Sequence, residues 1–247
     1  MYLKFRKNFY SQNGEDGIIK KIFKELDIKE NITVCEFGAW DGKYLSNVFN
    51  LVKEFNAKAL MIECDEFKFI ELTKTSKEYP NIIPINKLVS REGENSLDQI
   101  LLNANFDKDF DLLSIDIDSY DLEVWENLKN FNPKIVIIEI DSSEPPGIKQ
   151  RHDPKNNRFG SSFTSTLEVA QKKEYSLLAH TGNLIFIRKD LVKFTTLDNK
   201  FLKNPNLLFN YKIKDNVFIR IIRYFLPKII RDRINSNLKY KILSFFN

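Results

Sequence analysis

The stretch VCEFGAWDG, residues 34–42, decides the fold that we expect for this chain. An apolar run leads to Glu36, and two of the chain's 8 glycines follow it as Gly38 and Gly42. Glycines after a buried strand let the backbone turn sharply and pass close to a ligand. In an open parallel sheet, ligands bind at such turns, outside the carboxyl ends of the strands. The stretch therefore predicts the end of a first strand with a ligand site beside it.

The rest of the chain alternates between apolar strand-like runs and amphipathic helix-like runs. We predict strands at residues 31–37, 57–64, 81–90, 111–118, 133–141, 176–180 and 184–188. We predict helices at residues 13–26, 46–55, 66–79, 95–104, 121–131 and 165–175. Such alternation is typical of a parallel sheet covered by helices. We expect an α/β fold, Rossmann-like and doubly wound, with seven mostly parallel strands and an antiparallel hairpin at the sheet edge.

The C-terminal region differs in composition from the rest. The whole chain nets +4, and nine of its Lys and Arg residues fall within residues 212–247. We predict a main domain at residues 1–202 and a basic helical extension at residues 203–247. The extension mixes cationic and apolar residues, as in VFIRIIRYFLPKII, which suits a helix at an anionic membrane surface. It suits equally a helix that packs on the main domain or on a second copy of the chain.

Composition also narrows the compartment and the cofactors. There is no run of about 20 apolar residues and no secretory signal, so we expect a cytoplasmic protein. Cys35 and Cys64 lie in apolar runs and are expected to be buried thiols in a reducing compartment. Two histidines and two cysteines without paired spacing leave no expected zinc or haem site. Because the excess of basic residues lies in the extension, we expect no nucleic-acid partner.

Two acids follow the first two predicted strands closely. Glu36 stands where a pyrophosphate would have to lie, so the site favours a cationic ligand over a phosphorylated one. Glu63 follows Gly42 by 21 residues, close to the interval at which a carboxylate binds ribose hydroxyls. An ordinary charged strand end explains Glu63 equally well.

More carboxylates follow the next two predicted strands. They are Asp116, Asp118, Asp121, Glu139 and Asp141. Carboxylates packed together repel one another unless a cation lies between them. We interpret the cluster as a site for a cationic methyl donor, with one carboxylate as a general base or with several holding an ion such as Mg²⁺. Solvated cap and loop residues are the alternative interpretation for each one taken alone.

Several of these motifs, taken in order, resemble the FkbM-type S-adenosylmethionine-dependent methyltransferases. They are YSQNGEDGI (10–18), CEFGAWDG (35–42), MIE (61–63), DLLSIDIDSYD (111–121) and PKIVIIEID (133–141). The resemblance covers roughly residues 8–190. Many members methylate sugar hydroxyls in polysaccharide or natural-product pathways. The family often has a glycine and a glutamate where this chain has Ser119 and Asp118.

The resemblance implies S-adenosylmethionine as the cofactor. Its methionine part would be lined by Glu36, Gly38, Asp41 and Asn47. Glu63 would bind the ribose, Leu88 and Val89 would lie at the adenine, and Gln12 would cover the site.

The expected reaction moves a methyl group to a sugar hydroxyl of a nucleotide-activated sugar or a surface polysaccharide precursor, such as one for a capsule. Asp116 is expected to contact both donor and hydroxyl, while Asp118 and His180 are candidate bases. Asp116, Glu139 and Asp141 are candidate ligands for Mg²⁺. Abundant Lys, Asn, Ile and Phe indicate an AT-rich bacterial genome.

Two other functions remain open. The Asp116-Ile117-Asp118 acid pair is also typical of metal-dependent glycosyltransferases, although that function leaves the stretch from Glu36 to Glu63 unexplained. A non-catalytic scaffold recruited to a membrane by the extension is the other alternative.

The loop SSEPPGIKQRHDPKNNRFGSS, residues 142–162, is long for a connection in a compact domain, which indicates a functional segment. Its Lys149, Arg151 and His152 could meet a diphosphate of the substrate, or form a solvated basic loop.

Overall fold

The computed structural model describes residues 1–117, 119–156 and 158–213. Residues Met1–Ile213 form one compact unit. The unit includes residues 203–213, where Leu208 and Phe209 are buried in the core. Most of the predicted extension lies outside the described residues.

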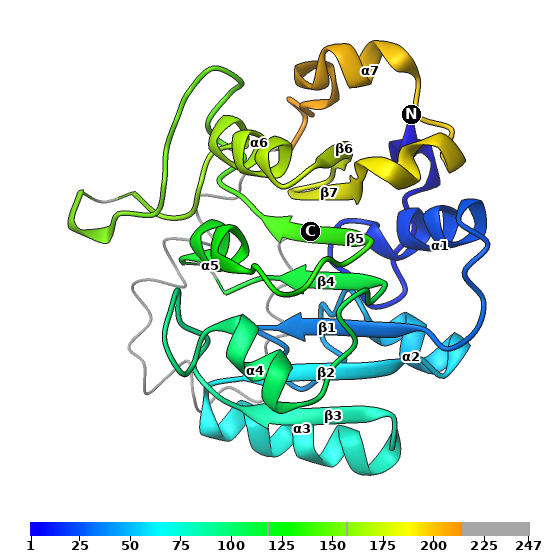
Figure 1. The fold of residues 1–247 in the computed structure, drawn as a ribbon, viewed down its shortest axis with the longest axis vertical. Helices are drawn as coiled ribbons and strands as arrows, with labels where there is room; N and C mark the ends of the chain where they lie inside the picture. The colour runs from blue at the N-terminus through cyan, green and yellow to red at the C-terminus, as the bar shows by residue number, and fades with distance from the viewer. Residues whose placement is uncertain (118, 157, 214–247) are drawn as a thin grey trace. The chain divides into compact units, whose positions relative to one another are not determined.

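Seven strands form one sheet (Figure 1). They are β1 Thr33–Phe37, β2 Lys58–Glu63, β3 Ile82–Asn86, β4 Leu112–Ile115, β5 Ile135–Glu139, β6 Tyr175–His180 and β7 Asn183–Arg188. Their order is β3-β2-β1-β4-β5-β7-β6, and β7 runs antiparallel to both of its neighbours. The predicted Rossmann-like sheet with an antiparallel edge hairpin is confirmed.

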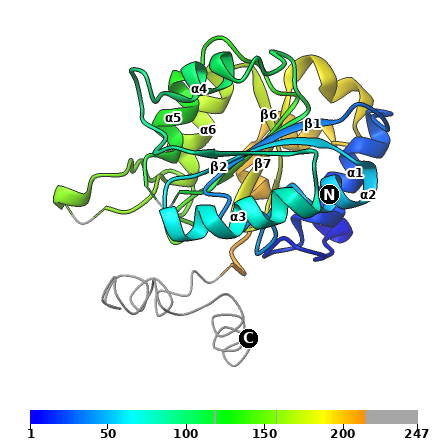
Figure 2. The same ribbon diagram turned by 90° about the horizontal axis from the view of Figure 1, so that it is seen from below.

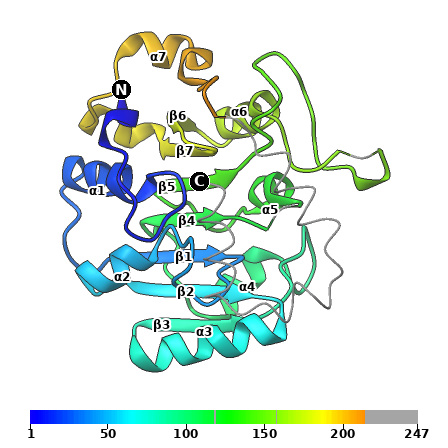
Figure 3. The same cartoon turned by 180° about the vertical axis from the view of Figure 1, so that it is seen from behind.

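Helices cover both faces of the sheet. The α-helices are α1 Glu15–Glu25, α2 Phe49–Phe55, α3 Glu66–Glu78, α4 Leu97–Asn103, α5 Asp121–Asn127, α6 Phe163–Lys172 and α7 Asn199–Lys203. Short 3-10 helices are η1 Tyr2–Phe5, η2 Pro154–Asn156, η3 Lys189–Phe194 and η4 Pro205–Leu208. Helices α4, α5 and α6 lie on one side of the sheet, and α1, α2 and α3 lie on the other (Figures 2 and 3). This arrangement makes the fold doubly wound.

The alternation of side chains along each strand divides the core into two apolar layers. Cys35 and Phe37 of β1 belong to the cluster under α4, α5 and α6, whereas Val34 belongs to the cluster under α1, α2 and α3. Every residue of β4 is buried, as expected for a parallel strand covered on both faces. Burial on both sides explains why the strands are nearly continuous apolar runs in the sequence.

Side-chain caps mark where two of the helices begin. Ser96 caps α4, because its hydroxyl accepts a bond from the amide of Gln99. Helix α6 starts earlier than predicted: Ser162 caps it by accepting from the amide of Ser165. Gly14 occupies the cap position of α1, so this helix begins without a side-chain cap.

The two cysteines differ. Cys35 is buried in β1 as predicted, and burial raises the pKa of its thiol. Cys64 is exposed, so the prediction of a second buried thiol is wrong. The reason is that β2 ends at Glu63, which leaves Cys64 in the loop that follows.

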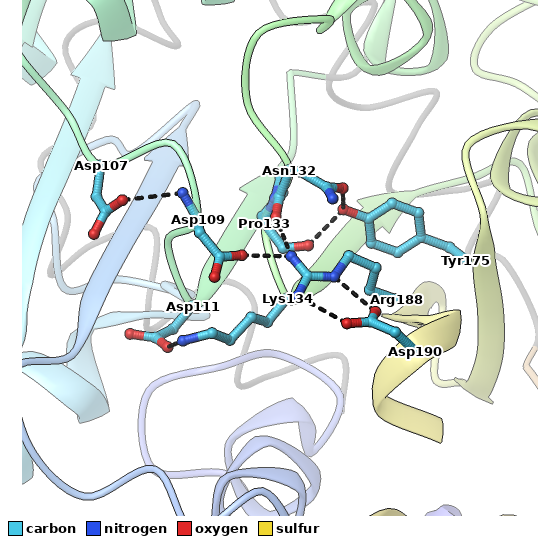
Figure 4. A network of polar contacts seen from close by, with 9 residues as sticks. All are labelled: Asp107, Asp109, Asp111, Asn132, Pro133, Lys134, Tyr175, Arg188 and Asp190. Atoms are coloured by element: carbon cyan, nitrogen blue, oxygen red, sulfur yellow. Dashed lines mark hydrogen bonds and ion pairs between the residues drawn. The ribbon is translucent and has the colours of Figure 1, made fainter. Parts of the chain in front are cut away.

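At the amino-terminal edge of the sheet, charged residues join the loops to the strands (Figure 4). Arg188, at the end of β7, donates to Asp109, to Asp190 at 2.8 Å and to the carbonyl of Asn132 at 2.9 Å. Lys134 pairs with Asp111 at 2.7 Å. Shallow hollows of about 490 and 670 Å³ lie between these residues. Most of the polar groups there already pair with one another, so we interpret this edge as structural.

No helix within the described part of the chain is both long enough and apolar enough to cross a membrane.

Candidate functional site

The strand order reverses between β1 and β4, so the loops that follow these two strands diverge and leave a crevice at the carboxyl edge. Gly38 lies at this point, exposed, with φ +80°. Its amide donates to the carbonyl of Ile62 at 3.0 Å, which ties the end of β1 to β2. The amide of Asp116 donates to the carbonyl of Phe37 at 3.3 Å, which ties β1 to the end of β4.

The two glycines of the stretch make room for the protein itself. A Cβ at Gly38 would lie 1.7 Å from the carbonyl oxygen of Asp116. A Cβ at Gly42, where φ is +78°, would lie 2.7 Å from Leu72 of α3. The space in which a Cβ would lie is thus filled by neighbouring protein atoms at both glycines. That the turn also passes close to a ligand stays a prediction. What the glycines allow is a tight turn over the ends of β1, β2 and β4.

Glu36 lies buried beneath this turn. Its carboxylate accepts the hydroxyl of Ser46 at 2.5 Å and the amide of Asn47 at 2.9 Å. Burial raises its pKa to about 7, although these hydrogen bonds act in the opposite direction. Asp16 of α1 adds a repulsive charge that raises it further. Glu36 thus fixes the loop through these hydrogen bonds, and its pKa lies close to neutral pH.

Asn47 and Asp41 shape the same loop. The carboxamide of Asn47 donates to Ser114 of β4 at 3.0 Å, and its side chain is buried. Asp41 accepts from the amides of Lys43 and Tyr44 at 2.8 and 2.7 Å, which closes a turn. The predicted methionine-lining residues are therefore brought together in one loop, where two of them, Glu36 and Asn47, serve as supports below the surface.

Glu63 ends β2 directly beside that loop. Its two oxygens accept the amides of Trp40 and Asp65 at 2.9 and 2.8 Å, and the residue is buried. The thiol of Cys64 also bonds this carboxylate. A carboxylate has about four acceptor positions, so a position remains for a hydroxyl group. Asn86, at the end of β3, donates to the carbonyl of Glu63 at 2.8 Å. The acid is thus held in place without being saturated.

The two residues expected at the adenine differ in exposure. The side chain of Leu88 is 68% exposed, whereas that of Val89 is buried in the core. An apolar side chain exposed just after β3 suits contact with a flat apolar ring. Of the pair, Leu88 is placed to meet a ligand by its side chain.

Asp116 follows β4 in a tightly curled loop. Asp121, the first residue of α5, accepts from the amides of Ile117 and Ser119, both at 2.8 Å. The half-buried Asp116 stands between this loop and Gly38. Asp118, the second candidate in the loop, lies outside the described residues.

The N-terminal segment also reaches the carboxyl edge. Asp16 accepts from the amides of Phe9, Tyr10 and Ser11, each at 2.8 Å. The buried Glu15 bonds the hydroxyl of Thr181 in the turn between β6 and β7. Burial raises the pKa of Glu15. These two acids anchor the segment that carries Gln12.

The side chain of Gln12 is exposed between these anchors, and its carbonyl accepts from Asn8 at 2.9 Å. Its role as a cover for the site stays a prediction.

His180 differs from its expected catalytic role. It has no exposed surface, and its ring lies between Phe163 and Phe209. Its Nδ1 accepts from the amide of Asn210 at 3.0 Å, and its Nε2 lies 2.9 Å from the hydroxyl of Ser142. Burial lowers its pKa to about 4. Both ring nitrogens are bonded to protein groups in the core, so in this arrangement His180 cannot take a proton from a substrate.

The expected ion site is not formed either. Among residues 1–117, 119–156 and 158–213, no three His, Cys, Asp or Glu side chains are grouped to hold a metal ion. Asp141 is buried and accepts from Ser143 and Gln150. Glu139 is paired in the sheet with Asn183 of β7. The positions of Asp116, Glu139 and Asp141 therefore do not fit a shared Mg²⁺.

The basic residues of the long loop are mostly neutralised. Arg151 pairs with Glu126 at 2.6 Å, and Lys149 pairs with Glu168 at 2.6 Å. The loop projects beyond the carboxyl ends of the strands (Figure 1). His152 is half-buried there, 4.5 Å from Tyr120 between ring centroids.

Sequence reasoning missed Ser114, Arg91 and Tyr120. Ser114 had a signal, since it is a lone hydroxyl within an apolar strand. Arg91 and Tyr120 had none, because they meet only through the folding of separate loops.

No protein-family model matches the chain, and no curated protein sequence matches it. Solved structures resemble its fold. An S-adenosylmethionine-dependent methyltransferase from Aquifex aeolicus is 17% identical, with a TM-score of 0.41 over 68% of this chain and 86% of that one. The N-terminal domain of EvdMO1 with bound SAH is 11% identical, with a TM-score of 0.44 over 72% and 80%. The [4+2]-cyclase SpnF is 10% identical, with a TM-score of 0.44 over 70% and 64%. These likenesses concern the fold alone.

Proposed function

We propose that this chain is an S-adenosylmethionine-dependent O-methyltransferase that acts on a sugar hydroxyl. The observation that carries the proposal is the buried carboxylate of Glu63, fixed beside the Gly38 turn with an acceptor position left for a hydroxyl. A carboxylate in this place at the end of the second strand is suited to a ribose.

The charge of the crevice supports the same cofactor. Glu63 and Asp116 lie at the ends of β2 and β4, where a pyrophosphate would be repelled. Lys43, the nearest cation in the loop sequence, pairs with Glu78 of α3 at 2.5 Å. An ammonium and a sulfonium suit these acids better than phosphates do.

The chemistry requires little more than alignment and one proton transfer. The cofactor supplies a methyl group on a positively charged sulfur. The sugar hydroxyl that takes this methyl group would have to lose its proton. Asp116 is our candidate to accept that proton, because it borders both the Gly38 turn and the loop after β4. Alignment alone can contribute about 7–11 kcal/mol of the barrier.

Calorimetric titration with S-adenosylhomocysteine tests the cofactor. Glu63→Ala should weaken binding by about 1–3 kcal/mol, since a hydroxyl bond to a carboxylate is lost. Glu66→Ala is the matched control, because Glu66 is an exposed acid in the first turn of α3. Unchanged affinity in Glu63→Ala would remove Glu63 from the site, and no binding by the native chain would refute the proposed cofactor.

A transfer assay tests the acceptor. Methyl-labelled S-adenosylmethionine is incubated with a panel of free sugars, sugar phosphates and nucleotide sugars, and base-stable label on the sugar is the expected product. Transfer of the sugar itself to an acceptor without any methyl donor would instead identify a glycosyltransferase.

A further inference from the structure

Three residues from three different loops meet at the carboxyl edge, and we call them the Arg91 cluster. The guanidinium carbon of Arg91 lies 4.5 Å from the ring centroid of Tyr120. The rings of Tyr120 and His152 are 4.5 Å apart at 64°. Arg91 follows β3, Tyr120 follows β4 and His152 follows β5. Loops after strand ends carry the ligand contacts in this class of sheet, so the cluster lies where an acceptor would bind.

The two rings of the cluster are held by bonds outside it. Asp121 curls the loop before Tyr120 by accepting from the amides of Ile117 and Ser119. The amide of Gly160 donates to Nδ1 of His152 at 3.1 Å. Because Nδ1 accepts, the neutral imidazole carries its proton on Nε2 and can donate there. The cluster therefore offers a ligand two fixed aromatic rings and one N–H donor.

The charge of Arg91 is not taken up by an ion pair among the described residues. Arg151 and Lys149 are bound to glutamates, whereas Arg91 is exposed and forms no ion pair with any residue in the described part of the chain. A guanidinium stacked on a ring keeps its N–H groups directed along its own plane. These groups match the paired oxygens of a phosphate.

We propose that the Arg91 cluster binds the acceptor and that the acceptor is a sugar bearing a phosphate or diphosphate. Arg91 pairs with the phosphate oxygens, and Tyr120 and His152 contact the sugar. This inference rests on the function proposed above and narrows it, because a phosphorylated sugar is distinguished from a neutral polysaccharide. The cofactor crevice is acidic, so a cation at the cluster also separates the anionic acceptor from the cationic donor.

Calorimetry on the full chain tests the inference, with UDP, UDP-glucose, glucose 1-phosphate and glucose titrated in the presence of saturating S-adenosylhomocysteine. The phosphorylated probes should bind and glucose should not. Arg91→Gln should weaken binding of UDP-glucose by about 10–100-fold, as expected for loss of a charged bidentate contact. Tyr120→Leu should weaken it as well. Arg158→Gln, at an exposed arginine of the long loop, is the matched control and should not change it.

The outcomes separate this inference from the function on which it rests. Equal binding of glucose and its phosphate, equal affinity in Arg91→Gln, or no binding of any phosphorylated probe while S-adenosylhomocysteine binds would overturn the inference alone. Failure of S-adenosylhomocysteine to bind, with Arg91-dependent binding of UDP-glucose retained, would overturn the methyl-transfer function and leave the phosphate site standing. Since Arg91 and Arg158 are exposed, thermal unfolding of both variants should match that of the native chain.

Discussion

Gly38 shows how one residue fixes the meeting of three strands. The backbone there has φ +80°, and the place of a Cβ is taken by the carbonyl of Asp116, which cannot move without displacing β4. Gly93 has nearly the same φ, +83°, with nothing within 4 Å of its Cβ position. Comparing an alanine substitution at each glycine therefore separates two contributions to the unfolding free energy, that of the left-handed backbone and that of the steric clash.

We expect Gly93→Ala to cost about 1–2 kcal/mol of unfolding free energy, the price of a left-handed alanine. Gly38→Ala should cost at least about 1–3 kcal/mol more, because the Cβ adds overlap with fixed backbone atoms. Urea denaturation of both variants measures the difference. Equal losses in the two variants would show that the contact with Asp116 relaxes freely.

The contribution of Glu36, which supports the same loop, to the stability of the fold depends on pH. Its pKa is raised to about 7 from an ordinary value of 4.5, chiefly by burial. Between these two values the folded chain holds more protons than the unfolded chain, so the contribution of Glu36 to stability is full at low pH and falls as pH rises. Glutamine at this position is neutral throughout.

The stability of Glu36→Gln relative to the native chain should therefore rise from about pH 5 to about pH 8, by up to an amount on the order of 3 kcal/mol. Thermal unfolding of both chains across this range measures it. The comparison cancels other titrating groups, such as Glu15, whose pKa is also raised. Parallel profiles for the two chains would contradict the inferred titration.

At the scale of elements, Arg188 joins the end of β7 to the loop that leads into β5. Its guanidinium bonds Asp109, Asp190 and the carbonyl of Asn132, as Figure 4 shows, and its side chain is 16% exposed. Tyr175 at the start of β6 bonds the carbonyl of Pro133 at 2.5 Å in the same loop. These contacts fix the register of the antiparallel hairpin at its open end.

Arg188→Gln should lower the unfolding free energy by about 1–3 kcal/mol, because several charge-assisted bonds of a mostly buried group are lost. Lys189→Gln is the control: Lys189 and its partner Glu174 are 45% and 71% exposed, so its loss should cost about 0–1 kcal/mol. Urea denaturation of both variants decides. A cost for Arg188→Gln no larger than that for Lys189→Gln would show that the hairpin holds its register without the network.

The elements could be predicted from the sequence because most strands are buried on both faces and read as apolar runs. Their ends were less certain, since a cap depends on which hydroxyl actually reaches an amide. Helix α6, predicted to begin at residue 165, begins just after Ser162, whose hydroxyl accepts the amides of Ser165 and Gln150 at 3.3 and 3.0 Å. Cys64 was misplaced for a related reason, since β2 stops one residue earlier.

At the scale of the whole molecule, strand alternation predicted the parallel sheet, and the acids after β1 and β2 predicted where its crevice lies. The partners of those acids could not be predicted. Glu15 meets Thr181 across 166 residues, and Arg91 meets Tyr120 between loops. Such pairs leave no periodic pattern, because each depends on how distant segments pack. His180 was predicted to be catalytic because of its residue type, but in the structure it is buried in the core.

The position of β7 has a consequence for how the protein is made. Strand β6 is at the edge of the sheet, and its one neighbour there is β7, the last strand of the seven to be translated. Until residue 188 has been translated, the backbone N–H and C=O groups on one edge of β5 lack their partners in β7, and β6 stays unpaired. Completion of the sheet is therefore a late event in synthesis, and a chain cut short before that residue would present an open edge to its neighbours.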